Sequence, residues 1–319
     1  MKAITIQLTK NCMLKCPYCF AGEKSNEFIS DDVLESVKQF VYKNQIPLIR
    51  ITGGEPFLYS QCVDVINYFS KRCIDLKVFS NLCVPHCFEG IAYPHKVIVL
   101  ANINNHEFYS EEQIKIIESN LSCAVKMGLR IIIGRTFYEP PYQIDDLVEL
   151  AKKYGVSTLR VSPANPTINS NNHFMKSDQI STLMIYLMKK QIELDSVGIV
   201  IRFDCPIPPC IVNTDAYSFF YNRKQLNNKC GKRLVVCIDG SVEHCYVTSS
   251  IIKLHINQFD TYDQMAFCME NELNNYSFNC VDTSNCIGCS YFNTSTPCGC
   301  YGFHKHLNEI QRKARGENK

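Results

Sequence analysis

Three cysteines near the N-terminus have a spacing that could hold a metal centre. Cys12, Cys16 and Cys19 form a C-x3-C-x2-C run, and the aromatic Tyr18 precedes the last of them. Three thiolates on one short loop can bind three irons of a [4Fe–4S] cluster and leave the fourth iron open to a small ligand. A structural zinc would need a fourth ligand from elsewhere, because such sites usually take four. The spacing favours the cluster and leaves zinc as the alternative.

A glycine-rich segment follows the second apolar run of the chain. Residues 52–56 read T-G-G-E-P directly after the mostly apolar residues 48–51. Two glycines allow a ligand to come close to the backbone, and the carboxylate of Glu55 could pair with an ammonium group. Taken alone, the segment indicates only a turn.

Both motifs must be positioned by the elements around them, and the first two thirds of the chain alternate between strands and helices. The expected strands are residues 3–9, 48–52, 76–80, 96–102, 129–134 and 158–162, all short apolar runs. A helix is expected after Ser30, with Asp31 and Asp32 in its first turn. Further helices are expected over residues 61–71, 111–127, 144–154 and 178–197.

Strand and helix repeated six times predict an α/β fold with right-handed crossovers and a parallel sheet. We expect a partial (β/α)6 TIM-type barrel over residues 1–203, with chemistry at the carboxyl ends of the strands. After residue 203 the rhythm stops, and a cysteine-rich domain is expected over residues 204–319. Within it, Asp239-Gly240 predicts the tight turn of a hairpin.

Composition narrows the class of protein. The formal net charge is +2, so nothing suggests a nucleic-acid surface. No apolar stretch suits a membrane span or a signal peptide, and we expect a cytoplasmic protein. The 19 cysteines are an odd number, and more than half lie between Cys205 and Cys300. In a cytoplasmic chain such clustering indicates metal binding or redox work rather than disulfides.

The cysteine loop and the G-G-E-P segment together resemble the radical SAM superfamily, whose open iron chelates S-adenosylmethionine (SAM). The resemblance covers roughly residues 3–203. It implies a [4Fe–4S] cluster ligated by Cys12, Cys16 and Cys19. It also implies that Tyr18 lies against the adenine, and that the methionyl ammonium is bound by Gly53, Gly54 and Glu55.

Further SAM contacts are implied at the ends of later strands. Ser80 and Asn81 match a Ser/Thr-Asn pair of the family, although leucine follows here where glycine is common. Asn102 is a candidate for the ribose hydroxyls, Arg135 for the methionyl carboxylate and Val161 for the adenine pocket. For these last three, ordinary strand-end polarity or core packing is an equal explanation.

The C-terminal part resembles the SPASM extension of radical SAM enzymes, which holds auxiliary [4Fe–4S] clusters. Cys230, Gly240 and Cys245 form C-x9-G-x4-C, the opening of that motif. The tail departs from the family spacing, because it reads C-x2-C-x8-C-x1-C. We expect one auxiliary cluster to be held by Cys210, Cys230, Cys245 and Cys300. A second would be held by Cys286, Cys289 and Cys298, with a fourth ligand from Cys280 or Cys237 or with an open iron.

Two alternatives to this assignment stay open. The shorter Twitch type would hold a single auxiliary cluster through Cys210, Cys230 and the pair Cys286 and Cys289. The pair Cys286 and Cys289 is also half of a zinc site, and a structural zinc in the tail is the second alternative.

The resemblance implies an enzyme that reductively cleaves SAM to a 5′-deoxyadenosyl radical, which abstracts hydrogen from a peptide or small molecule. We expect a radical SAM oxidoreductase or maturase whose auxiliary clusters support net oxidation or cross-linking. The alternatives are an epimerase, a C–C bond-forming enzyme, or a non-catalytic iron–sulfur or zinc protein on a degenerate barrel. No catalytic acid or base is identified.

Partners follow from the same resemblance. Peptide-modifying SPASM enzymes often carry an N-terminal leader-binding domain, and here the cysteine loop already starts at Cys12. We therefore expect no leader-guided reaction unless a separate protein supplies recognition. An electron donor such as flavodoxin or ferredoxin is expected, with no nucleic acid and no membrane.

Overall fold

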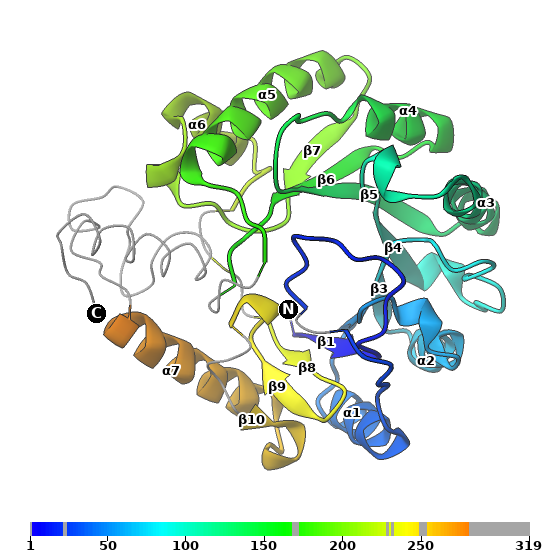
Figure 1. Cartoon of the computed structure of the whole chain (residues 1–319). Helices are drawn as coiled ribbons and strands as arrows, with labels where there is room; N and C mark the ends of the chain where they lie inside the picture. The colour runs from blue at the N-terminus through cyan, green and yellow to red at the C-terminus, as the bar shows by residue number, and fades with distance from the viewer. Residues whose placement is uncertain are drawn as a thin grey trace.

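A computed structural model shows an arc of strands with helices on its outer side (Figure 1). It describes residues 2–21, 24–167, 172–227, 230, 233–248 and 254–280, and only the backbone of residues 274 and 276–280. The strands are β1 (Ala3–Gln7), β2 (Leu48–Thr52), β3 (Asp75–Ser80), β4 (Val97–Asn102), β5 (Arg130–Phe137), β6 (Thr158–Pro163), β7 (Val200–Phe203), β8 (Val235–Val236), β9 (Ser241–Glu243) and β10 (Leu254–His255). The helices are α1 (Asp31–Lys43), α2 (Cys62–Ser70), α3 (Glu111–Met127), α4 (Asp145–Tyr154), α5 (Ser177–Asp195), α6 (Thr214–Asn222) and α7 (Tyr262–Cys280).

All ten strands of the described residues form one sheet in the order β10-β9-β8-β1-β2-β3-β4-β5-β6-β7. Strands β1 to β7 pair in parallel. An α-helix forms each crossover except the one from β3 to β4, which contains only the short 3-10 helix Pro94–Lys96, so the expected alternation of strand and helix is interrupted there. The α/β fold with a curved, mostly parallel sheet is therefore confirmed. Strand β7, only four residues long, was not expected.

The helix ends follow from local sequence. Ser30 caps α1, because its side chain accepts a hydrogen bond from the backbone N–H of Val33. Ser110 and Gln113 form a reciprocal capping box on α3, which ends at Gly128 with φ 76°. Helix α3 spans the residues that the sequence predicts. In the described part of the chain, no helix has the length and apolar composition to cross a membrane.

The predicted hairpin is confirmed, although its strands are short. Strands β8 and β9 pair antiparallel around Gly240, which has φ 83°. Strand β8 also pairs in parallel with β1. The hairpin therefore extends the barrel sheet rather than starting a separate one, and the division of the chain at residue 203 stays a prediction.

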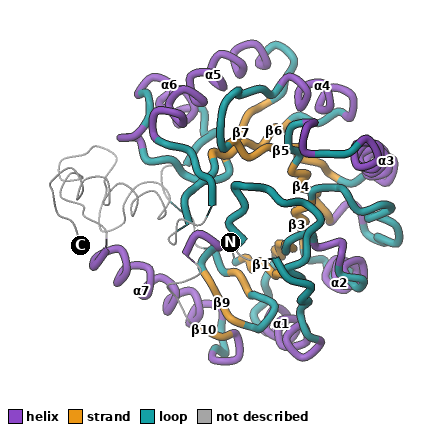
Figure 2. The backbone as a smooth tube through the Cα atoms, viewed as in Figure 1, coloured by secondary structure: helices purple, strands orange, loops and turns teal. Residues whose placement is uncertain are grey.

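The two faces of the barrel sheet differ in burial. Ile51 of β2 and Val78 of β3 belong to the face covered by helices and are fully buried. Side chains alternate along a strand, so Arg50 and Lys77 belong to the other face, toward the inside of the arc, and are only partly buried. Figure 2 shows the helices outside, the strands inside them and loops near the centre.

Candidate functional site

The cysteine loop follows β1 and is held at the carboxyl edge of the sheet by the G-G-E-P segment. The backbone N–H of Leu8 donates to the carbonyl of Thr52 at 2.9 Å. Beyond the strand, Gly54 N–H donates to Thr9 at 2.8 Å, and Glu55 N–H donates to Asn11 at 2.7 Å. The main chain of the two motifs is thus joined up to the residue before Cys12, which fixes where the loop begins.

Close approach of this loop explains the two glycines. A Cβ atom on Gly53 would lie 2.7 Å from the carbonyl oxygen of Thr9, and one on Gly54 only 2.2 Å from that of Asn11. Real Cβ atoms essentially never lie that close to another heavy atom. Any side chain at Gly53 or Gly54 would therefore push the loop away. In this structure the two glycines make room for the backbone that leads into the cysteine loop.

Glu55 is fully buried and joins the ends of β2 and β3. Its carboxylate accepts hydrogen bonds from Ser80 Oγ at 2.9 Å, from Asn81 N–H at 2.7 Å and from Phe57 N–H at 3.3 Å. Burial raises the pKa of Glu55 to about 7, while these three hydrogen bonds oppose the rise. The expected pairing with a methionyl ammonium stays a prediction, because both carboxylate oxygens already accept bonds from the protein.

Asn81, directly after β3, contacts the cysteine loop. Its side-chain N–H group points at Cys12 Sγ, 3.7 Å away, and its Oδ1 accepts from Cys83 N–H at 2.9 Å. The next residue, Leu82, has φ 60° and a fully buried side chain. The left-handed backbone explains why glycine suits this position, and Leu82 keeps the conformation while filling the core.

Asn104 is the corresponding link from the loop after β4, and sequence reasoning missed it. Its side-chain N–H group points at Cys16 Sγ at 3.5 Å, and its Oδ1 accepts from the hydroxyl of Tyr18. Asn102 donates to the same hydroxyl at 3.2 Å, while Asn102 Oδ1 is buried without a hydrogen-bond partner among the described residues. An unsatisfied buried acceptor beside Tyr18 fits a ligand hydroxyl there.

Arg135 supports this loop from β5. Its Nε donates to the carbonyl of Ile103 and its Nη2 to that of Asn104, both at 3.1 Å. Its Nη1 donates to Gln143 at 2.9 Å, and both terminal nitrogens face the carboxylate of Asp146. Since a guanidinium has five N–H groups, the expected contact with a methionyl carboxylate would require one of these bonds to break.

Val161 of β6 is fully buried and pairs in register with Arg135. It offers no exposed surface in this structure. Its expected place in the adenine pocket stays a prediction.

The loop cysteines fit an iron–sulfur cluster by their chemistry. Cys12, Cys16 and Cys19 are half-buried free thiols, and two of them face the amide donors of Asn81 and Asn104. Amide hydrogen bonds to sulfur are a normal feature of such clusters. Among the described residues, no three His, Cys, Asp or Glu side chains lie as close together as metal ligands.

The C-terminal cysteines are only partly placed. Cys230 and Cys245 are half-buried, Cys237 is buried and Cys210 is exposed. The side chain of Cys280 and all of Cys286, Cys289, Cys298 and Cys300 lie outside the described residues.

Cys205 was not among the predicted ligands. Burial raises its pKa to about 12, with Asp204 adding to the rise and Arg233 opposing it. Cys230 and Cys245 also act on this thiol, and all three thiols raise the pKa of Arg233. The signal in the sequence was only its place five residues before Cys210.

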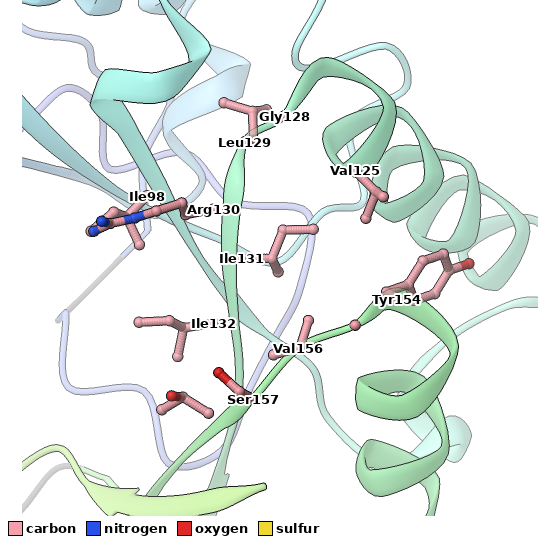
Figure 3. Close-up of a pocket in the computed structure, with 12 residues that line it drawn as sticks. Ile98, Val125, Gly128, Leu129, Arg130, Ile131, Ile132, Tyr154, Val156 and Ser157 are labelled. Atoms are coloured by element: carbon pink, nitrogen blue, oxygen red, sulfur yellow. The ribbon is translucent and has the colours of Figure 1, made fainter. Parts of the chain in front are cut away.

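A pocket of about 430 Å³ lies away from this site. It surrounds the start of β5, with Val125, Ile131 and Tyr154 on one side of the strand and Ile98 and Ile132 on the other (Figure 3). The amino ends of β5 and β6 line it, so it lies at the edge of the sheet opposite to the cysteine loop.

Known proteins have sequences that are similar to part of this chain. Human molybdenum cofactor biosynthesis protein 1 is 36% identical over 69 residues, which cover 20% of this chain and 11% of that protein. The antilisterial bacteriocin subtilosin biosynthesis protein AlbA of Bacillus subtilis is 30% identical over 80 residues, covering 24% of this chain and 18% of AlbA. The chain thus matches only a small part of these relatives' length.

Solved structures share the fold over nearly the whole chain. Streptococcus suis SuiB bound to precursor peptide SuiA has a TM-score of 0.70 at 14% identity, over 98% of this chain and 73% of SuiB. Native anSMEcpe with bound AdoMet has a TM-score of 0.68 at 15% identity, over 100% of both chains. At this identity the likeness shows the fold alone. The model of the radical SAM superfamily matches residues 6–105, the part of the chain that contains the cysteine loop and the G-G-E-P segment.

Proposed function

We propose that the protein is an oxidoreductase or maturase that uses SAM and a [4Fe–4S] cluster to modify a peptide or small molecule. When bound, cluster and SAM would supply a 5′-deoxyadenosyl radical that abstracts hydrogen from the substrate. Cys12, Cys16 and Cys19 would hold the cluster. The observation that carries the proposal is the junction of the cysteine loop with the G-G-E-P segment, with Asn81 and Asn104 directed at its sulfurs.

The surrounding residues would orient SAM and exclude water. Burial and the neighbouring Cys16 raise the pKa of Tyr18, so its hydroxyl stays protonated and donates to Asn104. The free acceptor on Asn102 would take a ribose hydroxyl. Glu55 would act by fixing Ser80 and Asn81 at the end of β3.

A peptide substrate is supported by the shared fold with SuiB and anSMEcpe, whose structures were solved with peptides bound. One or two auxiliary clusters on the C-terminal cysteines would support oxidation or cross-linking. A flavodoxin or ferredoxin as electron donor and a cytoplasmic location complete the proposal.

SAM cleavage is the direct test. The anaerobically reconstituted protein, given SAM and dithionite, should form 5′-deoxyadenosine. Replacing Cys12, Cys16 and Cys19 by alanine should abolish this, whereas the matched variant Cys73→Ala/Cys123→Ala/Cys268→Ala should keep it. A cluster-replete wild type that forms no 5′-deoxyadenosine would instead support a non-catalytic iron–sulfur protein.

Iron counting tests the auxiliary clusters separately. In the variant without Cys12, Cys16 and Cys19, only the C-terminal part can hold iron. About eight irons per chain would indicate two [4Fe–4S] clusters and about four would indicate one. Zinc in place of iron would contradict the auxiliary-cluster assignment.

A further inference from the structure

The inner face of the barrel carries basic side chains below the cysteine loop. Arg50 of β2, Lys77 of β3 and Arg160 of β6 belong to the partly buried face of their strands. Arg50 and Lys77 are direct partners in the β2–β3 ladder. Arg50 stands two residues before Thr52, so it lies about 7 Å below the strand end along β2. These cations therefore form a layer beneath the site.

Two further charges complete the layer. Arg233, just before β8, donates from Nη2 to the carbonyl of Asp204 at 3.2 Å. The carboxylate of Asp204, just after β7, lies 3.5 Å from Nη2 of Arg160. Together Arg50, Lys77, Arg160 and Arg233 are named the inner cation cluster below.

The inner cation cluster has one carboxylate for four positive charges. Although burial alone would raise the pKa of Asp204, the charges of the four cations hold it below its ordinary value. Asp204 is also the only carboxylate that acts on Arg50 and Lys77 among the described residues. Arg233 also has the thiols of Cys205, Cys230 and Cys245 near it, so the unbalanced positive charge is that of Arg50 and Lys77.

Of the four cations, Arg50 and Lys77 are the least compensated by hydrogen bonds and opposite charges. The Nη1 atom of Arg50 is buried and has no hydrogen-bond partner among the described residues. Burial lowers the pKa of Lys77, and the neighbouring charges of Arg50 and Arg130 lower it further. Even partial removal of a charged group from water is unfavourable without a partner, and a counter-charge would offset this cost. Their arrangement is therefore better suited to a bound anion than to an empty barrel.

We propose that the inner cation cluster binds an anionic group of the substrate, a phosphate or a carboxylate. Arginine donors pair well with both groups, and a cleft of one sign concentrates counter-ions. Such an anchor would hold the substrate inside the barrel with its uncharged part toward the cysteine loop. Naming the anion a substrate group rests on the proposed function, whereas binding of the anion does not.

Calorimetric titration of the reconstituted protein without SAM or reductant tests the proposal. Sodium phosphate and sodium succinate are the two probes, at constant ionic strength. We expect one of them to bind, and Arg50→Gln and Lys77→Gln each to weaken it at least tenfold, the loss of one charge-assisted contact. Lys115→Gln on the exposed side of α3 removes the same charge and should leave binding unchanged.

The thermal unfolding midpoint separates binding from a structural role. Since the cations repel one another, Arg50→Gln and Lys77→Gln should not lower the midpoint of the anion-free protein. Phosphate binding would assign a phosphorylated substrate, and succinate binding would assign a carboxylate. The proposal is overturned if neither anion binds, if Arg50→Gln binds as tightly as wild type, or if both substitutions lower the midpoint. Because SAM is absent, a failure of SAM cleavage would not affect this result.

Discussion

The two cysteine-bearing regions hold their thiols by different means. Around the N-terminal loop the support is shape and neutral hydrogen bonds: the backbone ladder to Gly54 and Glu55, and the amides of Asn81 and Asn104 at sulfur. Burial is the largest cause acting on the pKa of Cys12 and raises it, whereas a backbone hydrogen bond at Leu14 and, more weakly, Lys24 lower it, and no cation of the described residues is hydrogen-bonded to Cys12 or Cys16.

Around the C-terminal thiols the support is a formal charge. Arg233 lowers the pKa of Cys245 against the rise caused by burial, and the thiols in turn raise the pKa of Arg233. Within the described residues, the hydrogen bonds of Cys245 are local, such as the one its N–H donates to Thr248 Oγ1 at 3.3 Å. The first region should therefore respond most to changes of shape, and the second to changes of charge.

Gly54→Ala should have the largest effect. The added Cβ would meet Asn11 O at 2.2 Å, and backbone cannot yield as a side chain tip can, so we expect a loss of about 3 kcal/mol of stability. The cysteine loop should move and its iron should be lost, while iron at the C-terminal cysteines remains. Iron and sulfide content with urea unfolding measures both.

Gly128→Ala is the matched control for this change. A Cβ at Gly128 meets nothing within 4 Å, and only its φ of 76° is unfavourable. It should cost about 1 kcal/mol and keep all iron. Full iron in Gly54→Ala would show that the loop is not held by its close approach to this segment.

Glu55→Gln should change how stability depends on pH. Because the folded pKa of Glu55 is raised from 4.5 to about 7, the unfolded chain ionises first as pH rises. Wild-type stability should then fall between pH 4.5 and 7, and stay lower above it, by about 3 kcal/mol. Glu55→Gln cannot ionise and should lose this part of the fall, leaving the part contributed by Glu243, whose pKa burial also raises to about 7.

Urea unfolding of the apoprotein from pH 4.5 to 8 measures the difference. Glu149→Gln, at an exposed position of α4, should keep the wild-type profile. Parallel profiles for wild type and Glu55→Gln would mean that the buried carboxylate titrates at its ordinary pKa.

Arg233→Gln tests the charge support of the second region. Removing a positive charge beside a cluster disfavours its reduction. We expect the reduction equilibrium of the C-terminal cluster to fall about tenfold, which is 59 mV for one electron, with the N-terminal cluster unchanged. Redox titration followed by electron paramagnetic resonance measures both, with the exposed Arg202→Gln as control. An equal shift of both clusters would remove the distinction between the regions.

The sequence predicted features that lie within one contiguous segment. Helix α3 and strand β2 match their expected ends, and the cysteine loop with Gly53 and Gly54 was found from its spacing. Contacts across the chain were not predictable, because a lone asparagine such as Asn104 carries no pattern and meets Cys16 over a separation of 88 residues. Cys205 was missed for the same reason.

Asn104→Ala should have the smallest effect of these substitutions. It tests most directly whether neutral hydrogen bonds act on the N-terminal thiols as charge does on the C-terminal ones. Losing one N–H donor to Cys16 Sγ destabilises the more negative, reduced state of the cluster. We expect its reduction equilibrium to fall about threefold, roughly 30 mV, less than the charge removal at Arg233. Tyr18→Phe removes the hydroxyl bond to Asn104 but keeps the N–H group of Asn104, and it should shift the potential less than Asn104→Ala does.

The electron paramagnetic resonance signal to follow is the one that disappears when Cys12, Cys16 and Cys19 are replaced. If Tyr18→Phe shifts this potential as much as Asn104→Ala, then Asn104 acts through the position of Tyr18 rather than through sulfur. If neither shifts it, the 3.5 Å contact between Asn104 and Cys16 is packing alone. The N-terminal region would then be defined by its backbone ladder, and the contrast with Arg233 would become one of shape against charge.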